Sequence, residues 1–204
     1  MQNKNHWYDG WFYDRIIAPN QDQLFGQIKN LIEPQSKVID VGCGTGRLAF
    51  ALADHCQSVL GIDLSKRNVD RAKLTLEQRT FGQILFQHTS LGEMLQEGPA
   101  HFDYAVITFV IHEVNEDERI ALLKEMAQIA DRIIVGDYVV PRPGGFNGFL
   151  SEVIEFLAGT EHYRNYKSYM GNGGIRHLAN QAGFRILNEI NKQATTSHIV
   201  ILAK

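Results

Sequence analysis

Glycines and carboxylates with a spacing suited to a nucleotide-like ligand lie in the first third of this sequence. Three glycines alternate with other residues in the segment Gly42-Cys43-Gly44-Thr45-Gly46. Glycine tolerates positive φ and lets a ligand approach the backbone closely. An acid, Asp63, follows 17 residues after Gly46, close to the roughly 20 residues expected for a carboxylate that binds a ribose diol. The pattern predicts a site for a ligand that carries a ribose.

Two short apolar strands are needed to position these groups. Residues 37–41 have the pattern of a buried parallel strand before the glycine turn, and residues 58–63 have that of a second strand, which ends in Asp63. Because neighbouring parallel strands end at the same edge of a sheet, we expect Asp63 beside the glycine turn. The alternative is that Asp63 caps the helix that follows, although Ser65 is also able to cap it.

The remainder of the chain alternates between predicted strands and helices, which favours an α/β fold with a parallel sheet. Asn115 and Glu118 have the spacing of a capping box at the start of one of these helices. The last two strands are joined by a short polar link, which predicts an antiparallel pair. The other predicted strands are 84–88, 102–108, 132–140, 184–190 and 197–203, and the main predicted helices are 22–32, 146–158 and 173–182.

Composition limits the classes of function. The 204 residues fit a single domain, 1–204, and the formal net charge of -3 comes without a basic run, so we expect no nucleic-acid partner. Two cysteines are too few for a disulfide framework, which favours a reducing, cytoplasmic setting. No apolar run reaches the roughly 20 residues of a membrane helix, and residues 1–6 lack the apolar core of a signal peptide.

Three motifs resemble those of class I S-adenosylmethionine-dependent methyltransferases. They are Val38-Ile39-Asp40-Val41-Gly42-Cys43-Gly44-Thr45-Gly46, Gly61-Ile62-Asp63-Leu64-Ser65, and the strand 102–107 followed by His112-Glu113-Val114. A dinucleotide fold more often shows Gly-x-Gly-x-x-Gly, and here the third glycine comes one residue early. The resemblance implies a Rossmann-like three-layer sandwich whose seven-stranded, mostly parallel sheet has the order 3-2-1-4-5-7-6, with strand 7 antiparallel.

The resemblance also implies a cofactor, S-adenosyl-L-methionine, and the residues that bind it. The glycine turn would support the methionyl part with the help of Asp40 and Thr108, Asp63 would hold the ribose, and Leu64 would pack on adenine. Many relatives carry an acid after strand three that binds the adenine amino group, and here Thr89 and Ser90 occupy that place. The implied cofactor-binding residues are Asp40, Gly42, Cys43, Gly44, Gly46, Asp63, Leu64, Thr89, Ser90 and Thr108.

The acceptor side is predicted to lie in the segments that flank the sheet edge. His112 follows the fourth strand and is a candidate general base, or else a structural histidine between helix and sheet. Tyr163 is a second candidate catalytic residue, within an aromatic insert at 141–172 that is either an acceptor pocket or a solvated loop. The aromatic residues of the segment 1–33 are expected to cap the core or to form a lid. We expect no metal site, because His112 and Asp137 are two isolated candidates on different strands.

These features favour a methyltransferase that moves a methyl group to a small-molecule acceptor by in-line displacement. Two other functions fit the same residues. A nicotinamide (NAD)-dependent oxidoreductase would use the glycine turn for pyrophosphate and Asp63 for ribose. A non-catalytic protein that binds S-adenosylmethionine or S-adenosylhomocysteine would use the same cofactor site without any catalytic residue. The acceptor atom and the oligomeric state stay open at this point.

Overall fold

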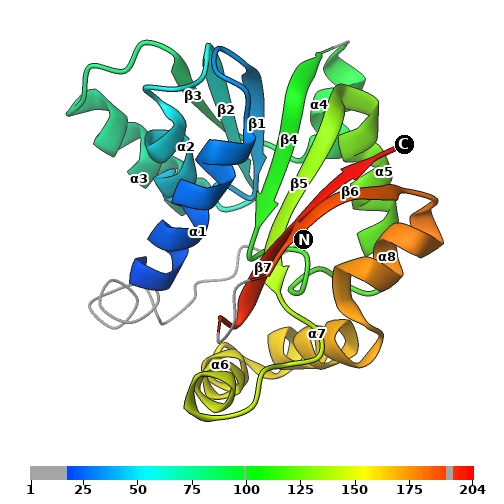
Figure 1. Cartoon of the computed structure of the whole chain (residues 1–204). Helices are drawn as coiled ribbons and strands as arrows, with labels where there is room; N and C mark the ends of the chain where they lie inside the picture. Colours follow the sequence, from blue (N-terminus) through cyan, green and yellow to red (C-terminus); the bar gives the residue numbers. More distant parts are fainter. Residues whose placement is uncertain (1–17, 99, 192–194) are drawn as a thin grey trace.

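A seven-stranded sheet forms the centre of the computed structural model, which describes residues 18–98, 100–191 and 195–204 (Figure 1). The strand order is β3-β2-β1-β4-β5-β7-β6. The first five strands pair in parallel, whereas β7 runs antiparallel to both β5 and β6. The predicted fold class and strand order are therefore confirmed. The strands are β1 (Lys37–Val41), β2 (Ser58–Asp63), β3 (Ile84–His88), β4 (Phe102–Thr108), β5 (Ala130–Tyr138), β6 (Arg185–Ile190) and β7 (Ser197–Ala203).

Helices cover both faces of this sheet. Three helices, α1 (Ala18–Leu31), α2 (Arg47–Leu52) and α3 (Lys66–Glu77), lie on one face. The opposite face carries α4 (Leu91–Glu97), α5 (Arg119–Ile129) and α8 (Gly174–Ala182). Each face has its own core of buried apolar side chains, so the molecule has three layers. Within the described ranges, no helix has the length and hydropathy that crossing a membrane requires.

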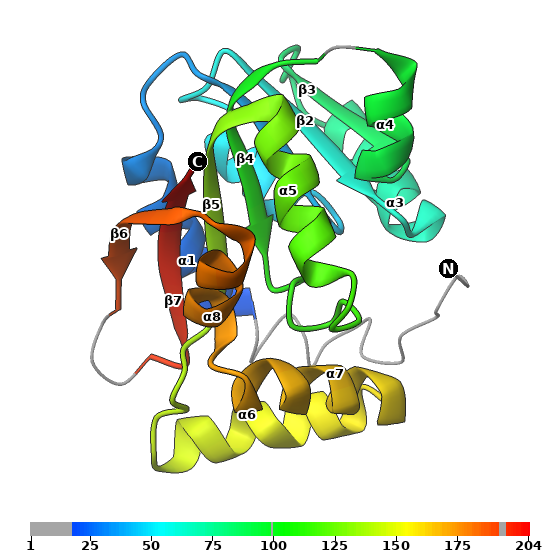
Figure 2. The same cartoon turned by 90° about the vertical axis from the view of Figure 1, so that its right-hand side faces the viewer.

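Two helices lie outside these layers and cover one edge of the sheet. They are α6 (Phe146–Leu157) and α7 (Thr160–Gly171), which lie side by side below the ends of β4 and β5 (Figures 1 and 2). They come from the predicted insert at 141–172. The carboxyl ends of parallel strands form the ligand-binding edge of such sheets, so α6 and α7 enclose that edge.

The segment 141–172 was predicted to be either an acceptor pocket or a solvated loop, and part of it forms the helix α7. Its buried side chains are His162, Asn165, Tyr166 and Tyr169. They follow helical spacing, but all four carry polar atoms, so a search for an apolar stripe passes over them. The predicted aromatic lid falls largely on residues 1–17, which lie outside the described residues.

Three local predictions were wrong. The predicted capping box does not form, because α5 begins after Glu118 without a side-chain cap, and Asn115 instead contacts Glu118 at 3.5 Å. The strand β5 begins at Ala130 and ends at Tyr138, two residues earlier than predicted at each end. The helix α1 begins at Ala18 rather than at residue 22.

Candidate functional site

In the glycine turn after β1, the middle glycine has free space beside it, whereas the first and third glycines pack against other residues. Gly42, Gly44 and Gly46 have φ values of 75°, 54° and 84°, in the left-handed region that favours glycine. A Cβ atom on Gly42 would collide with Val110, and one on Gly46 would collide with Phe86. A Cβ atom on Gly44 would meet no described atom within 4 Å. The turn therefore packs against the protein at its ends and leaves Gly44 accessible to a ligand.

The carboxylate of Asp40 is buried beside this turn, and no described residue forms a hydrogen bond with it. Its side chain is 1% exposed, and neither of its oxygens has a hydrogen-bond partner in the part of the chain that the structure describes. Burial, and then the nearby charge of Asp63, raise the pKa of Asp40 from 3.8 to about 7. A buried carboxylate without a partner is costly, and a cationic group of a ligand would remove that cost.

The carboxylate of Asp63 is held at the end of β2 by two backbone amides. The amide of Gly44 donates to its Oδ2 at 2.8 Å, and the amide of Ser65 donates to its Oδ1 at 2.7 Å. Each carboxylate oxygen has a second lone pair for a further donor. The cap of α3 is Ser65, whose hydroxyl accepts from the amide of Asn68. Asp63 is thus joined to the glycine turn, as the predicted ribose site requires, and is not the N-cap.

A cluster of imidazoles and carboxylates lies at the same edge of the sheet, between the strand ends and the helices α6 and α7. His112 and Asp137, 2% and 0% exposed, join Nδ1 to Oδ1 at 2.7 Å. Glu155 on α6 accepts a hydrogen bond from the Tyr138 hydroxyl at 2.6 Å and also bonds to Nε2 of His162. The other ring nitrogen of His112, Nε2, has no hydrogen-bond partner among the described residues and lies 3.5 Å from Glu155 Oε2. The cluster joins the end of the sheet to both edge helices.

Charge interactions outweigh desolvation in this cluster. Burial by itself lowers the pKa of His112, but the carboxylates of Asp137 and Glu155 outweigh burial and raise that pKa well above its usual value. Burial raises the pKa of Glu155, yet the imidazoles of His112 and His162 outweigh burial and hold it well below its usual range. The cluster thus favours a charged imidazole at His112 next to charged Glu155.

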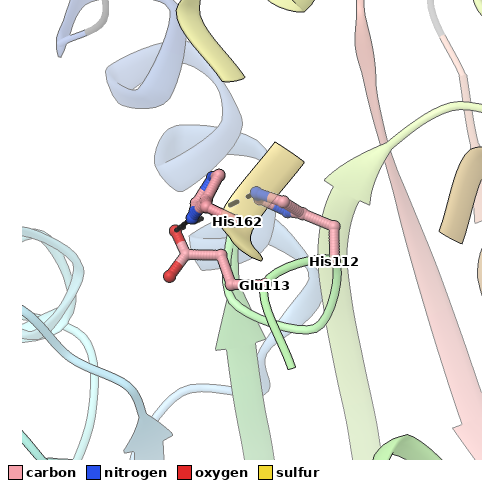
Figure 3. A group of neighbouring side chains, drawn as sticks. All are labelled: His112, Glu113 and His162. Atoms are coloured by element: carbon pink, nitrogen blue, oxygen red, sulfur yellow. Dashed lines mark ion pairs between the residues drawn. The ribbon is translucent and has the colours of Figure 1, made fainter. Parts of the chain in front are cut away.

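A third acid, Glu113, completes a group with the two histidines (Figure 3). Its Oε1 lies 3.9 Å from Nε2 of His112 and 3.9 Å from Nδ1 of His162. One potential metal-ligating atom from each of the three residues lies within 4.8 Å of the other two. The Glu113 side chain is 37% exposed, so the group is open on that side. We call His112, Glu113 and His162 the His–Glu–His group.

A buried arginine ties the loop after β4 to α7. The guanidinium of Arg119, whose residue is 1% exposed, donates to the carbonyl of Val114 at 3.0 Å and to that of Asn165 at 2.6 Å. The Asn165 amide in turn donates to the carbonyl of Glu113 at 2.8 Å. These bonds fix the backbone that carries His112 and Glu113 relative to the helix that carries His162.

Comparisons with known proteins relate this sequence and its fold to known methyltransferases. The family model described as a methyltransferase domain matches residues 38–131. An uncharacterized methyltransferase from Synechocystis sp. is 33% identical over 119 residues, which are 58% of this chain and 48% of that protein. A ubiquinone biosynthesis O-methyltransferase from Coxiella burnetii is 35% identical over 165 residues, 74% of this chain and 64% of that protein. Residues 38–131 therefore match the methyltransferase domain family.

Solved structures support the same fold for this chain. Magnesium protoporphyrin IX methyltransferase from Synechocystis with bound S-adenosylhomocysteine aligns with a TM-score of 0.69 and 22% identity, covering 97% of this chain and 90% of that one. At this identity the likeness concerns the fold alone. The chain spans about half the length of the first curated relatives that it matches.

The structure brings the predicted cofactor residues to one edge, with two qualifications. Leu64 is 51% exposed directly after Asp63, and Thr108 ends β4. Ser90 caps α4 in a capping box with Glu93, and the Thr89 hydroxyl donates to the same carboxylate at 3.2 Å, so both hydroxyls already have local partners. Cys43 is 8% exposed and packs in the core, and its thiol donates to the carbonyl of Gly44 at 3.7 Å within the turn.

The predicted acceptor residues are less close together. The hydroxyl of Tyr163 donates to Glu152 at 2.9 Å, and its ring contacts Tyr166, whose own ring lies 6.2 Å from His112. Tyr163 is thus one aromatic ring removed from the His112 cluster. Sequence reasoning missed Glu113, Arg119 and Glu155. For Glu113, its place directly after His112 at the ligand edge was the available signal, whereas for Glu155 a polar residue in an apolar helix was the only local hint.

Proposed function

We propose that this protein is a methyltransferase that moves a methyl group from S-adenosyl-L-methionine to a small-molecule acceptor. The observation that carries the proposal is the buried, unpartnered carboxylate of Asp40 beside the open face of Gly44. A ligand with an ammonium group and a ribose matches Asp40 and Asp63 together. A pyrophosphate is negatively charged, unlike an ammonium group, and would be repelled by the carboxylate of Asp40. This argues against the nicotinamide alternative.

The chain's own residues suit the remaining parts of this cofactor. Asp63 is oriented by two amides to accept the ribose hydroxyls, and Leu64 offers an exposed apolar surface for adenine. The open backbone at Gly44 leaves room for the methionyl chain, near Thr108. When bound, the sulfonium supplies a methyl group that is already activated for displacement. The protein then has to align the acceptor with that methyl group and exclude water.

The acceptor is proposed to bind between the sheet edge and the helices α6 and α7. These helices enclose the edge, which suits a small molecule better than a protein or a nucleic acid. Relatives named as O-methyltransferases support a hydroxyl acceptor. His112 and Tyr163 stay predictions as catalytic residues, and His112 must release its own proton before it can accept one from the acceptor, because Asp137 and Glu155 raise its pKa. A cytoplasmic location is part of the same proposal.

Calorimetry tests the cofactor assignment. The wild-type protein is titrated separately with S-adenosylmethionine, S-adenosylhomocysteine and NAD. We expect Asp63→Ala to weaken binding of the first two by about 1–3 kcal/mol, the scale of lost hydrogen bonds to a charged group. Asp70→Ala is the control, because Asp70 is an exposed acid that pairs with Lys66 on α3. Binding of NAD without binding of the sulfonium would refute the proposal.

A non-catalytic binding protein is the second candidate. It would show the same calorimetry, so turnover must be measured separately. A screen of phenols, amines and carboxylic acids with a labelled methyl donor distinguishes the two functions. Labelled product from any class supports the enzyme, whereas tight cofactor binding with no transfer across all classes supports the binding protein.

A further inference from the structure

We infer that the His–Glu–His group is a binding site for a divalent transition-metal ion at the acceptor edge. Two imidazoles and one carboxylate are a common ligand set for zinc and for other divalent first-row metals. Figure 3 shows the three side chains converging from the loop after β4 and from α7. The nitrogen of His112 that faces the group, Nε2, is buried without a hydrogen-bond partner in the described ranges, and lies 3.5 Å from Glu155 Oε2 and 3.9 Å from Glu113 Oε1.

Each histidine has a carboxylate on the ring nitrogen that faces away from Glu113. Asp137 bonds to Nδ1 of His112, and Glu155 bonds to Nε2 of His162. A metal-binding histidine almost always donates its other ring N–H to a carboxylate, a carbonyl or water, which fixes the tautomer and the direction of the ligating nitrogen. This arrangement directs Nε2 of His112 and Nδ1 of His162 toward the same carboxylate of Glu113.

The separations require only a small contraction. Glu113 Oε1 lies 3.9 Å from each of the two nitrogens. With bonds of about 2.0–2.1 Å, ligand atoms in a tetrahedral zinc site lie roughly 3.4 Å apart. Glu113, whose side chain is 37% exposed, is able to move by about half an ångström toward each nitrogen, and the two nitrogens, which lie within 4.8 Å of each other, approach as well. The backbones of His112 and Glu113 are held in place by Arg119 and Asn165, at 3.4 and 2.8 Å from their carbonyls.

Charge favours a cation at this place. Metal binding requires both imidazoles to be neutral, and the three carboxylates of Glu113, Asp137 and Glu155 then outweigh the fixed positive charge of the nearby Arg119 guanidinium. Three protein ligands leave at least one coordination position for water or for an oxygen atom of an acceptor. The relevance to acceptor binding rests on the proposed function, whereas the metal site itself does not.

Metal binding is measured directly on the full chain. Protein treated with a chelator is dialysed against buffered Zn²⁺ and analysed for metal, and Co²⁺ is then added as a spectroscopic probe of coordination. We expect one equivalent of metal with the visible absorption of a nitrogen- and oxygen-ligated site. Glu113→Gln and His162→Gln should each lower Zn²⁺ affinity by at least about tenfold, and Asp137→Asn, a positioning residue, by about 10–100-fold.

A matched control and a separate readout keep the test decisive. His177→Gln removes an exposed histidine on α8 and should keep full Zn²⁺ affinity. Glu113→Gln changes a partly exposed side chain, so it should fold even if the buried variants do not. Absence of stoichiometric binding, or equal affinity in Glu113→Gln and His177→Gln, overturns the inference. Calorimetry with S-adenosylmethionine on the metal-free protein tests the proposed function independently.

Discussion

Replacing Asp40 with asparagine tests the electrostatics of the cofactor edge. Asp40 is 1% exposed, both of its oxygens lack partners among the described residues, and burial followed by the charge of Asp63 raises its pKa from 3.8 to about 7. Asparagine keeps the shape of the side chain and removes its ionisation. The substitution should therefore change how the stability of the protein depends on pH.

The magnitude follows from the pKa difference. Between pH 3.8 and about 7 the folded protein retains a proton that the unfolded chain releases. The free energy of unfolding of the wild type therefore falls as pH rises, by about 1.4 kcal/mol per pH unit. From about pH 5 to about pH 7 this amounts to roughly 3 kcal/mol, and the loss levels off above the folded pKa. Asp40→Asn lacks this contribution.

Urea unfolding at about pH 5 and about pH 8 measures this difference. We expect Asp40→Asn to gain roughly 3 kcal/mol relative to the wild type over this interval. Asp117→Asn, at an exposed acid, controls for the loss of one negative charge. Parallel pH dependences of wild type and Asp40→Asn, within about 0.5 kcal/mol, would refute the reasoning. The same variant should bind S-adenosylmethionine more weakly, because the ammonium group loses its counter-charge.

Three further predictions concern other parts of the site. Gly44→Ala should lose at least about tenfold in cofactor affinity by calorimetry. Gly183→Ala is the control, because Gly183 also has a positive φ, 79°, and equally open surroundings. It should share the left-handed strain of about 1–2 kcal/mol without the loss of affinity. Arg119→Ala should destabilise the protein to urea by about 3 kcal/mol, because it leaves buried carbonyls without donors. Ser90→Ala should cost about 1 kcal/mol in thermal unfolding, the usual contribution of a helix cap.

The cofactor edge was predictable because its signals are local in sequence. The glycines of the turn and Asp63 at the end of β2 stand in short motifs, and the parallel pairing of β1 with β2 brings them together. Ser90 shows the limit of such reasoning. A residue type alone does not reveal that its hydroxyl is already committed to the first turn of α4.

The acceptor edge was less predictable because it is assembled by tertiary packing. Glu155 and His162 lie on helices whose direction across the sheet edge is set by packing rather than by any local motif. The buried side of α7 consists of side chains with polar atoms, which pattern analysis assigns to a surface. His112 and Asp137 were named from the sequence as isolated candidates, and the contacts of His112 with Asp137 and with Glu155 follow only from the fold.

The residues of the His112 cluster come from two different segments of the sequence. His112 and Glu113 belong to the segment 38–131 that matches the family, whereas Asp137, Glu155 and His162 come after it. The segment that holds the proposed cofactor groups is thus separate in sequence from α6 and α7, although the two parts are in contact in the fold. Substitutions on α6 or α7 would therefore change the surroundings of His112 while the glycine turn and Asp63 keep their places at the ends of β1 and β2.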